Sequence, residues 1–173
     1  MNIISKNITL RALEPEDLDV LYQWENNATL WHLSNTLVPF SRYILKQYIE
    51  SSYQDIYQTK QLRLIIEKND TRKVIGAIDL FDFDPSNLRA GIGILVGDKN
   101  DRGKGYAYEA LQKLIEYCFS TLLLKQLYCN ILSKNVESIN LFTKAGFELI
   151  GNKKKWIRIG DEFYDELILQ LIK

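Results

Sequence analysis

One loop of the sequence combines two glycines with two basic residues. It covers residues 101–107, with the sequence DRGKGYA, between an apolar segment and a segment with helical spacing. The first backbone amides of a helix have no partner inside the helix and carry the positive end of its dipole, so they favour phosphate groups. Gly103 and Gly105 let the backbone approach such a group, and Arg102 and Lys104 add positive charge. We therefore expect a phosphate or pyrophosphate site at this loop.

Two other phosphate-binding loops have patterns that this loop does not meet. A P-loop requires the sequence Gly-Lys-Ser/Thr after four spacer residues, whereas Gly105 here is followed by Tyr106. The dinucleotide-binding fingerprint requires three glycines at its own spacing and a later acidic residue. For the loop taken alone, a glycine-rich turn without a ligand remains an alternative. The neighbouring elements must decide between these interpretations.

The neighbouring segments predict an α+β fold around one mixed sheet. Leu111, Leu114 and Cys118 recur at helical spacing after the loop, and the apolar run Ile92–Val96 before it predicts a central strand covered on both faces. Gly146 is expected to end a later helix in the left-handed conformation. The predicted order is β-α-α-β-β-β-α-β-α-β-β, with about seven strands, mostly antiparallel, flanked by about four helices. The strands are expected at 8–13, 62–67, 74–81, 92–96, 126–132, 147–158 and 162–172, and the helices from about 15 to 24, 41 to 57, 107 to 118 and 136 to 145.

Composition limits the classes of protein to consider. The chain has 173 residues, of which 46% are hydrophobic, so we expect a single domain over residues 1–173. Lys+Arg and Asp+Glu both number 22, so no net charge attracts nucleic acid or an anionic membrane. No apolar run is long enough to span a bilayer and the first residues do not resemble a signal peptide, which favours the cytoplasm. Cys118 and Cys129 fall in apolar segments that are typical of buried free thiols.

The loop and two further segments resemble the GNAT superfamily of N-acetyltransferases. Arg102, Gly105 and Ala107 match the pattern Arg/Gln-x-x-Gly-x-Gly/Ala with which that family binds the pyrophosphate of acetyl-CoA. The segment Asn135–Phe147 is similar to the family's Asn-x-x-Ser…Gly-Phe segment, and Ile8–Asp17 resembles the opening of the ribosomal-protein and spermidine acetyltransferase branches. The resemblance covers nearly the whole chain. It implies the GNAT fold, with acetyl-CoA as co-substrate.

The resemblance also implies which residues contact acetyl-CoA. In the family, the strand before the loop separates from the next strand, and the pantetheine arm lies between them. Asn135 would contact the distal part of the cofactor, and its position also fits that of a helix N-cap. The implied cofactor-binding residues are Ile94, Leu95, Val96, Arg102, Gly103, Lys104, Gly105, Tyr106, Ala107, Asn135, Asn140 and Phe142.

The family reaction implies a role for Ser138. An amine attacks the thioester directly, which requires a deprotonated amine, a polarised carbonyl and a proton for the departing thiolate. Many relatives donate that proton from a tyrosine where this chain has Phe142, which has no hydroxyl. The ribosomal-protein branch suggests Ser138 as the donor instead. The alternative is that Ser138 is an ordinary residue of the first turn of a helix.

The general base stays open at the level of sequence. Relatives often carry glutamate at the positions that Gly91 and Ile157 occupy in this chain. The alternatives are Glu25, Asp79, Asp82 or a chain of water molecules. Each of these carboxylates also fits a surface role.

The acceptor is expected to be a primary amine, either a protein N-terminus or a small amine. The resemblance places Trp31, His32 and Asp79 as candidates for binding it, and no cluster of ligands suggests a metal. A polyamine is the alternative acceptor, which the nearly neutral segment Asn26–Leu33 weakens. A different class of function is a non-catalytic acyl-CoA-binding sensor. A homodimer is a further expectation, and nucleic acid and membranes are not expected partners.

Overall fold

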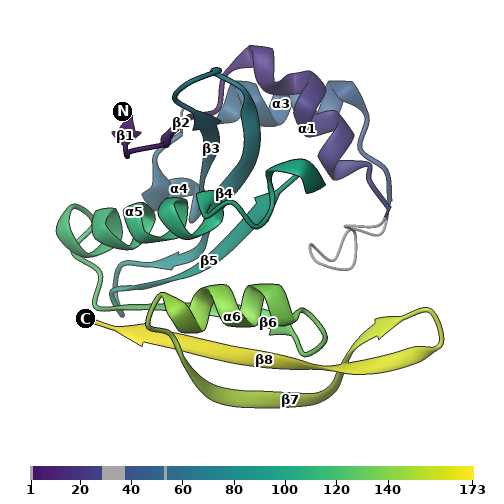
Figure 1. Ribbon diagram of the computed structural model, residues 1–173, viewed down its shortest axis with the longest axis vertical. Helices are drawn as coiled ribbons and strands as arrows, with labels where there is room; N and C mark the ends of the chain where they lie inside the picture. The colour runs from purple at the N-terminus through teal and green to yellow at the C-terminus, as the bar shows by residue number, and fades with distance from the viewer. Residues whose placement is uncertain (1, 29–37, 53) are drawn as a thin grey trace.

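The computed structural model describes residues 2–28, 38–52 and 54–173, which build an open sheet of eight strands in the order β1-β2-β3-β4-β5-β6-β8-β7 (Figure 1). The predicted α+β fold is confirmed. The strands are β1 (Ile3–Ile4), β2 (Ile8–Ala12), β3 (Leu62–Lys68), β4 (Val74–Asp84), β5 (Arg89–Val96), β6 (Gln126–Leu132), β7 (Glu148–Ile159) and β8 (Glu162–Ile172). The α-helices are α1 (Leu18–Glu25), α3 (Arg42–Ser51), α4 (Ile56–Thr59), α5 (Tyr106–Ser120) and α6 (Val136–Lys144), with short 3-10 helices η1 (Pro15–Asp17) and η2 (Lys99–Asp101).

The described residues contain eight strands and five α-helices, where the sequence predicted about seven and four. The extra strand β1 has two residues, paired with Leu10 and Thr9 of β2, and is too short to show an alternation. The extra helix α4 is a single turn, begun by the side chain of Asp55 and ended by Lys60 in a left-handed conformation. The segment expected as one helix from about 41 to 57 therefore forms two.

Helix α6 follows from local sequence signals at both of its ends. At the start, the side-chain oxygen of Asn135 accepts a hydrogen bond from the amide of Ser138. At the end, Gly146 has φ +97°, and the amides of Gly146 and Phe147 donate to the carbonyls of Thr143 and Phe142. This pair of bonds is a Schellman motif, which satisfies carbonyls that a helix end leaves unpaired. The predicted left-handed role of Gly146 is confirmed.

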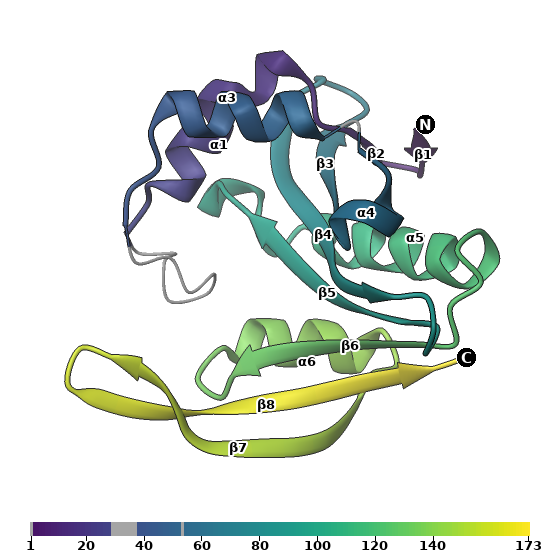
Figure 2. The ribbon, with the colours of Figure 1, turned by 180° about the vertical axis from the view of Figure 1, so that it is seen from behind.

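Helices cover the sheet on both faces (Figure 2). Helices α5 and α6 lie on one face, where Leu111, Leu114 and Phe142 pack into the main core with strands β2 to β6 and β8. Helices α1 and α3 lie on the other face, where Leu21 and Ile49 form a smaller core with β3 and β4. Among the described residues, no helix has the length and apolar character needed to cross a membrane.

Strand β5 lies centrally, but β6 pairs only with its first three residues. Parallel pairing with β6 joins Arg89 to Gln126, Ala90 to Leu127 and Gly91 to Tyr128, and then ends. Figure 2 shows the two strands side by side at one end and apart at the other. Residues 90–92 are buried, whereas 93–96 are half-buried. The expectation that the whole run 92–96 is covered on both faces was therefore wrong for residues 93–96, which are only half-buried.

Candidate functional site

The separation of β5 from β6 leaves strand backbone without a strand partner. The opposite edge of β5 stays paired with β4 as far as Val96, so β5 remains a regular strand beyond Gly91. On the side of β6, pairing stops at Gly91 and Tyr128. Unpaired backbone groups in a protein interior need other partners. The half-buried residues Ile94, Leu95 and Val96 lie on this part of β5, beyond its pairing with β6.

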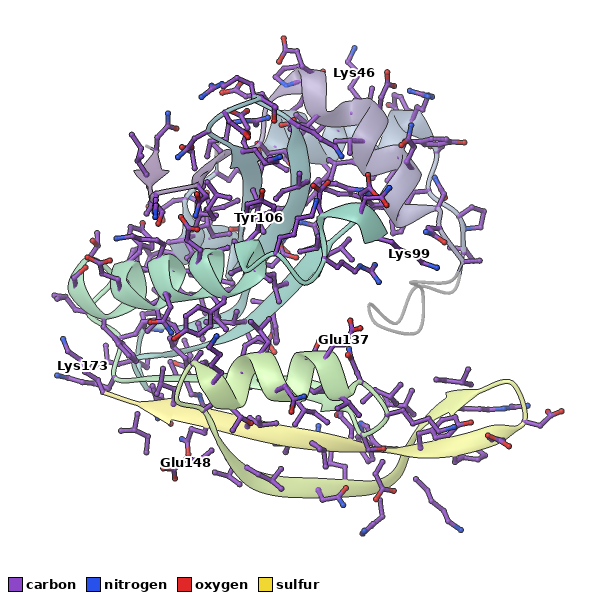
Figure 3. All side chains as sticks on the ribbon, viewed as in Figure 1. Lys46, Lys99, Tyr106, Glu137, Glu148 and Lys173 are labelled. Atoms are coloured by element: carbon purple, nitrogen blue, oxygen red, sulfur yellow. The ribbon has the colours of Figure 1, made fainter. Side chains whose placement is uncertain are left out.

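The glycine-rich loop runs from the end of η2 to the start of α5. Gly103 has φ +72° and Gly105 has φ +87°, left-handed values that favour glycine. A Cβ atom built on either residue would meet nothing within 4 Å among the described residues, so the space beside the loop is open. Nε of Arg102 donates to the carbonyl of Val96 over 3.1 Å, which links the loop to the end of β5. Tyr106 is the first residue of α5 (Figure 3).

This loop has an anchor that the sequence did not reveal. Asp101 is 5% exposed, and its carboxylate accepts a 2.7 Å hydrogen bond from Nζ of Lys73, which also contacts Asp98 at 3.0 Å. These two carboxylates raise the pKa of Lys73. Lys73 lies in the turn before β4, and no motif connects it with the loop. Its role depends on the tertiary fold, which brings the two turns together.

Helix α6 carries the second predicted group of residues. Figure 3 shows Tyr106 at the start of α5 and Glu137 at the start of α6. Ser138 is half-buried in the first turn of α6, and Asn140 is exposed. Phe142 is 3% exposed, and its ring packs edge-on against Phe147 with centroids 5.0 Å apart. Phe142 thus belongs to the main core.

Two candidate bases are held by one arginine on the sheet face that carries α1 and α3. The guanidinium of Arg63 donates to both carboxylate oxygens of Asp79, over 2.8 and 2.9 Å, and to Glu25 over 2.7 Å. It also lies 5.6 Å from the ring centroid of Tyr48. Burial raises the pKa of the Tyr48 phenol. The charge of Asp79 is therefore offset by Arg63. The other two candidates for binding the acceptor, Trp31 and His32, lie outside the described residues.

A third carboxylate lies where β5 and β6 begin to separate. The ring of Phe81 covers Gly91, and it meets the ring of Tyr128 edge-on with centroids 5.7 Å apart. The hydroxyl of Tyr128 donates to Oδ2 of Asp82 over 3.0 Å. Asp82 is exposed and has φ +49°, at the irregularity where β4 loses its regular register with β5. Sequence reasoning named Asp82 as one candidate base but had no signal for its contact with Tyr128.

The separated strands, the loop at the helix start and the capped second helix match one known family. The model of the GNAT acetyltransferase domain matches residues 7–148. This chain belongs to the GNAT acetyltransferase family. The resemblance drawn from the two motifs is thereby confirmed.

Individual relatives agree with the GNAT assignment over nearly the whole chain. An uncharacterized N-acetyltransferase of Bacillus licheniformis is 29% identical over 99% of this chain and 96% of its own length. A spermidine N(1)-acetyltransferase of Escherichia coli is 25% identical over 84% of this chain and 75% of its own length. The crystal structure of spermidine N-acetyltransferase from Vibrio cholerae, in complex with CoA and spermine, has a TM-score of 0.85 at 22% identity and covers 95% of each chain.

Within the GNAT fold, this chain lacks side chains that the family commonly uses. Phe142 is a core residue, and the surface of Gly91 is covered by Phe81. The pairing of β5 with β6 ends at Gly91, and the space beside Gly103 and Gly105 is open. The positions of Phe142 and Gly91 carry no side chain that could donate or accept a proton.

Proposed function

We propose that this GNAT domain binds acetyl-CoA between β5 and β6 and transfers the acetyl group to a primary amine. The observation that carries the proposal is the end of β5–β6 pairing at Gly91 and Tyr128, followed by a loop whose glycines have left-handed φ values at the start of α5. The separated strands would receive the extended pantetheine arm, and the loop that follows β5 would receive the pyrophosphate. The family assignment supports the same reaction.

The loop fits an anionic group in three respects. The first amides of α5 have no intrahelical partner, and the helix dipole places positive charge there. Arg102 and Lys104 are exposed beside these amides. The free space at Gly103 and Gly105 lets a phosphate approach the backbone. The amides from Gly103 to Ala107 would then hold the pyrophosphate, with Ile94, Leu95 and Val96 along the pantetheine arm.

When bound, acetyl-CoA supplies an activated thioester, and the residues of the chain orient and polarise it. Attack by the amine nitrogen forms a C–N bond as the C–S bond breaks, so the nitrogen loses a proton and the sulfur gains one. Backbone amides of β5 beyond Gly91 can donate to the carbonyl oxygen as negative charge develops on it. Holding both reactants in one site contributes further to the rate.

Ser138 is the proposed source of the proton for sulfur. Its amide is fixed by the side chain of Asn135 at 3.2 Å, which holds the first turn of α6 in place. The residue is half-buried, and no side-chain hydrogen bond of its hydroxyl is formed within the described residues. The hydroxyl is thus available to a neighbouring sulfur. Asn135 and Asn140, also on this helix, would contact the distal part of the cofactor.

The release of free thiol from acetyl-CoA tests the proposal. Purified protein is mixed with acetyl-CoA and a panel of amines: a peptide with a free N-terminus, hexylamine, an amino sugar and spermidine. We expect thiol release that depends on one or more amines, together with an acetylated product in the mass spectrum. Tight CoA binding in calorimetry with no turnover on any amine would instead indicate an acyl-CoA sensor.

A further inference from the structure

A cavity of about 490 Å³ opens on the sheet face opposite to α5 and α6. Along β6 and β8, the residues that line the cavity alternate with Leu127, Cys129 and Leu169, which belong to the main core. Successive side chains of a strand point to opposite faces, so the cavity lies on the face opposite to that core. The cavity is lined by Asp82, Asp84, Arg89, Gln126, Tyr128, Ile150, Ile168 and Gln170. Its volume lies within the range of pockets that bind small molecules.

Tyr128 connects this cavity with the proposed acetyl-CoA site. It belongs to the last residue pair of β5 and β6, and its side chain forms part of the cavity wall. The reactive end of a ligand arm placed between the separated strands would therefore end next to the cavity. Phe81, packed on Gly91, closes the adjacent surface of β5. An amine in the cavity would thus approach the strands at the point where they separate.

Two of the three charged groups in the cavity neutralise each other. Arg89 contacts Asp84 at 3.3 Å, and the carboxylate of Asp84 also accepts hydrogen bonds from the amides of Ser86 and Asn87 and from the side chain of Asn87. These bonds hold the turn between β4 and β5. Half of the Arg89 side chain is exposed, and its charge is offset by Asp84. The Arg89–Asp84 pair therefore adds no net charge to this side of the cavity.

The third charged group, Asp82, has no cationic partner within residues 2–28, 38–52 and 54–173. Its one hydrogen-bond partner there is the hydroxyl of Tyr128, which is a neutral donor. The chain outside these ranges contains no Lys or Arg. Burial raises the pKa of Tyr128 to about 12, with a further contribution from its bond to Asp82. The phenol therefore stays protonated at neutral pH and fixes one carboxylate oxygen, which leaves the other free.

We infer that Asp82 binds the ammonium group of the acceptor and that this cavity selects a primary amine with a single positive charge. The inference rests on the proposed function. One carboxylate without a cation matches one ammonium, and Asp84, already paired with Arg89, leaves no free carboxylate for a second ammonium in the same cavity. Tyr128 acts as a positioning residue, because it orients the carboxylate of Asp82.

The remaining wall residues indicate the chemical character of the part of the acceptor beyond its ammonium group. Ile150 and Ile168 supply an apolar surface, and the amide of Gln170 donates to the side-chain oxygen of Gln126. Such a wall fits an alkyl or aryl chain with few charged groups. A polyamine has ammonium groups along its whole length, and Arg89 would have to leave Asp84 to accommodate it. The expected acceptor is therefore a monoamine with a partly apolar body.

Steady-state kinetics of three amines of increasing charge test this inference: hexylamine, hexamethylenediamine and spermidine. For Asp82→Asn, we expect the KM for hexylamine to rise at least about tenfold, the effect of losing one charge-assisted bond. The KM for acetyl-CoA should stay within about twofold, because Asp82 lies outside the proposed acetyl-CoA site. The matched control is Asp161→Asn, at the exposed turn between β7 and β8.

Two further variants separate a binding role from a structural one. Tyr128→Phe keeps the ring packed on Phe81 but removes the donor, so the KM for hexylamine should rise about threefold with an unchanged KM for acetyl-CoA. Arg89→Gln frees the carboxylate of Asp84 for a second ammonium and should raise the ratio of kcat/KM for hexamethylenediamine over hexylamine about fivefold. A merely structural role for Arg89 would leave this ratio unchanged.

The outcomes distinguish this inference from the proposed function. Absence of wild-type turnover on any amine contradicts the proposed function itself. Wild-type turnover with an unchanged amine KM in Asp82→Asn and an unchanged ratio in Arg89→Gln overturns the inference alone. A wild-type preference for spermidine over hexylamine also overturns it. Circular dichroism of each variant confirms that the fold is retained in the kinetic comparison.

Discussion

Cε2 of Phe81 lies 2.2 Å from the position that a Cβ atom on Gly91 would take. The surface of β5 at Gly91 is thus available only to the aromatic ring. A side chain such as the family's glutamate could not enter this position unless Phe81 moved. The two residues are neighbours across β4 and β5, so a change at one of them affects the other. The packing of Phe81 against Gly91 therefore leaves no space for a glutamate side chain at this position.

Gly91→Ala should lower the free energy of unfolding by about 1–3 kcal/mol, the usual effect of overpacking. Urea denaturation measures the change. Gly151→Ala is a matched control, because its Cβ would lie 3.5 Å from Ile168, an ordinary contact. Phe81→Leu in the Gly91→Ala background should recover part of the loss. If the two single changes are additive in the double variant, the proposed steric relationship is wrong.

Asp79→Ala should reduce stability with little effect on amine binding. Arg63 would keep Glu25 but lose both bonds to Asp79, in a setting where the Arg63 side chain is 24% exposed. We expect the free energy of unfolding to fall by about 2 kcal/mol, less than for a fully buried ion pair. Urea denaturation and the KM for hexylamine are the two measurements. A large rise in that KM without loss of stability would instead make Asp79 part of the acceptor site.

Ser138→Ala should lower kcat about tenfold or more and leave the KM for acetyl-CoA nearly unchanged, because a proton donor to sulfur acts mainly in the transition state. Thr143→Ala is the control, since Thr143 is an exposed hydroxyl residue on the same helix. Both variants keep the Asn135 cap. An unchanged kcat in Ser138→Ala would remove this hydroxyl from the mechanism.

The two cysteines should resist thiol reagents in the native protein. Burial raises the pKa of Cys118 and of Cys129 to about 12, whereas free thiols titrate near 8.5. At about pH 8, a disulfide reagent should therefore react only when the protein unfolds. Rapid labelling of either native thiol would contradict the buried positions.

The same pKa values predict how stability changes at high pH. Above about pH 9 the unfolded thiols lose protons that the folded thiols retain until about pH 12, so the free energy of unfolding should fall with pH in this window. Below that window the contribution is fully present. Replacement of Cys118 and Cys129 by Ala should reduce the slope of stability against pH. An identical slope would show that other groups cause the decline.

Local signals in the sequence predicted the parts of this fold that depend on neighbouring residues. Helix α6 has Asn135 at its start and Gly146 after its end, and both cues act within a few residues. The loop at Gly103 and Gly105 was found in the same way, because left-handed backbone and free amides follow from residue type and position. The order of the longer elements follows from hydrophobic periodicity.

Contacts between distant segments could not be predicted in this way. The bond between Lys73 and Asp101 joins two turns, and the contact between Tyr128 and Asp82 joins β6 to an irregularity in β4. The sequence contains no period or motif for either pair. The candidate bases illustrate the consequence: Asp79 and Asp82 are alike in the sequence, yet one is bound to Arg63 and the other lines a cavity.

The affinity for CoA of two glutamate variants tests the pyrophosphate site at the start of α5. Gly105 and Gly160 both have positive φ and open space around the Cβ position, so Gly105→Glu and Gly160→Glu carry similar backbone strain. Only Gly105 lies at the start of α5. In calorimetry we expect Gly105→Glu to weaken CoA binding at least about a hundredfold, and Gly160→Glu to bind like the wild type. Equal CoA affinity of the two folded variants would contradict a pyrophosphate site at this loop.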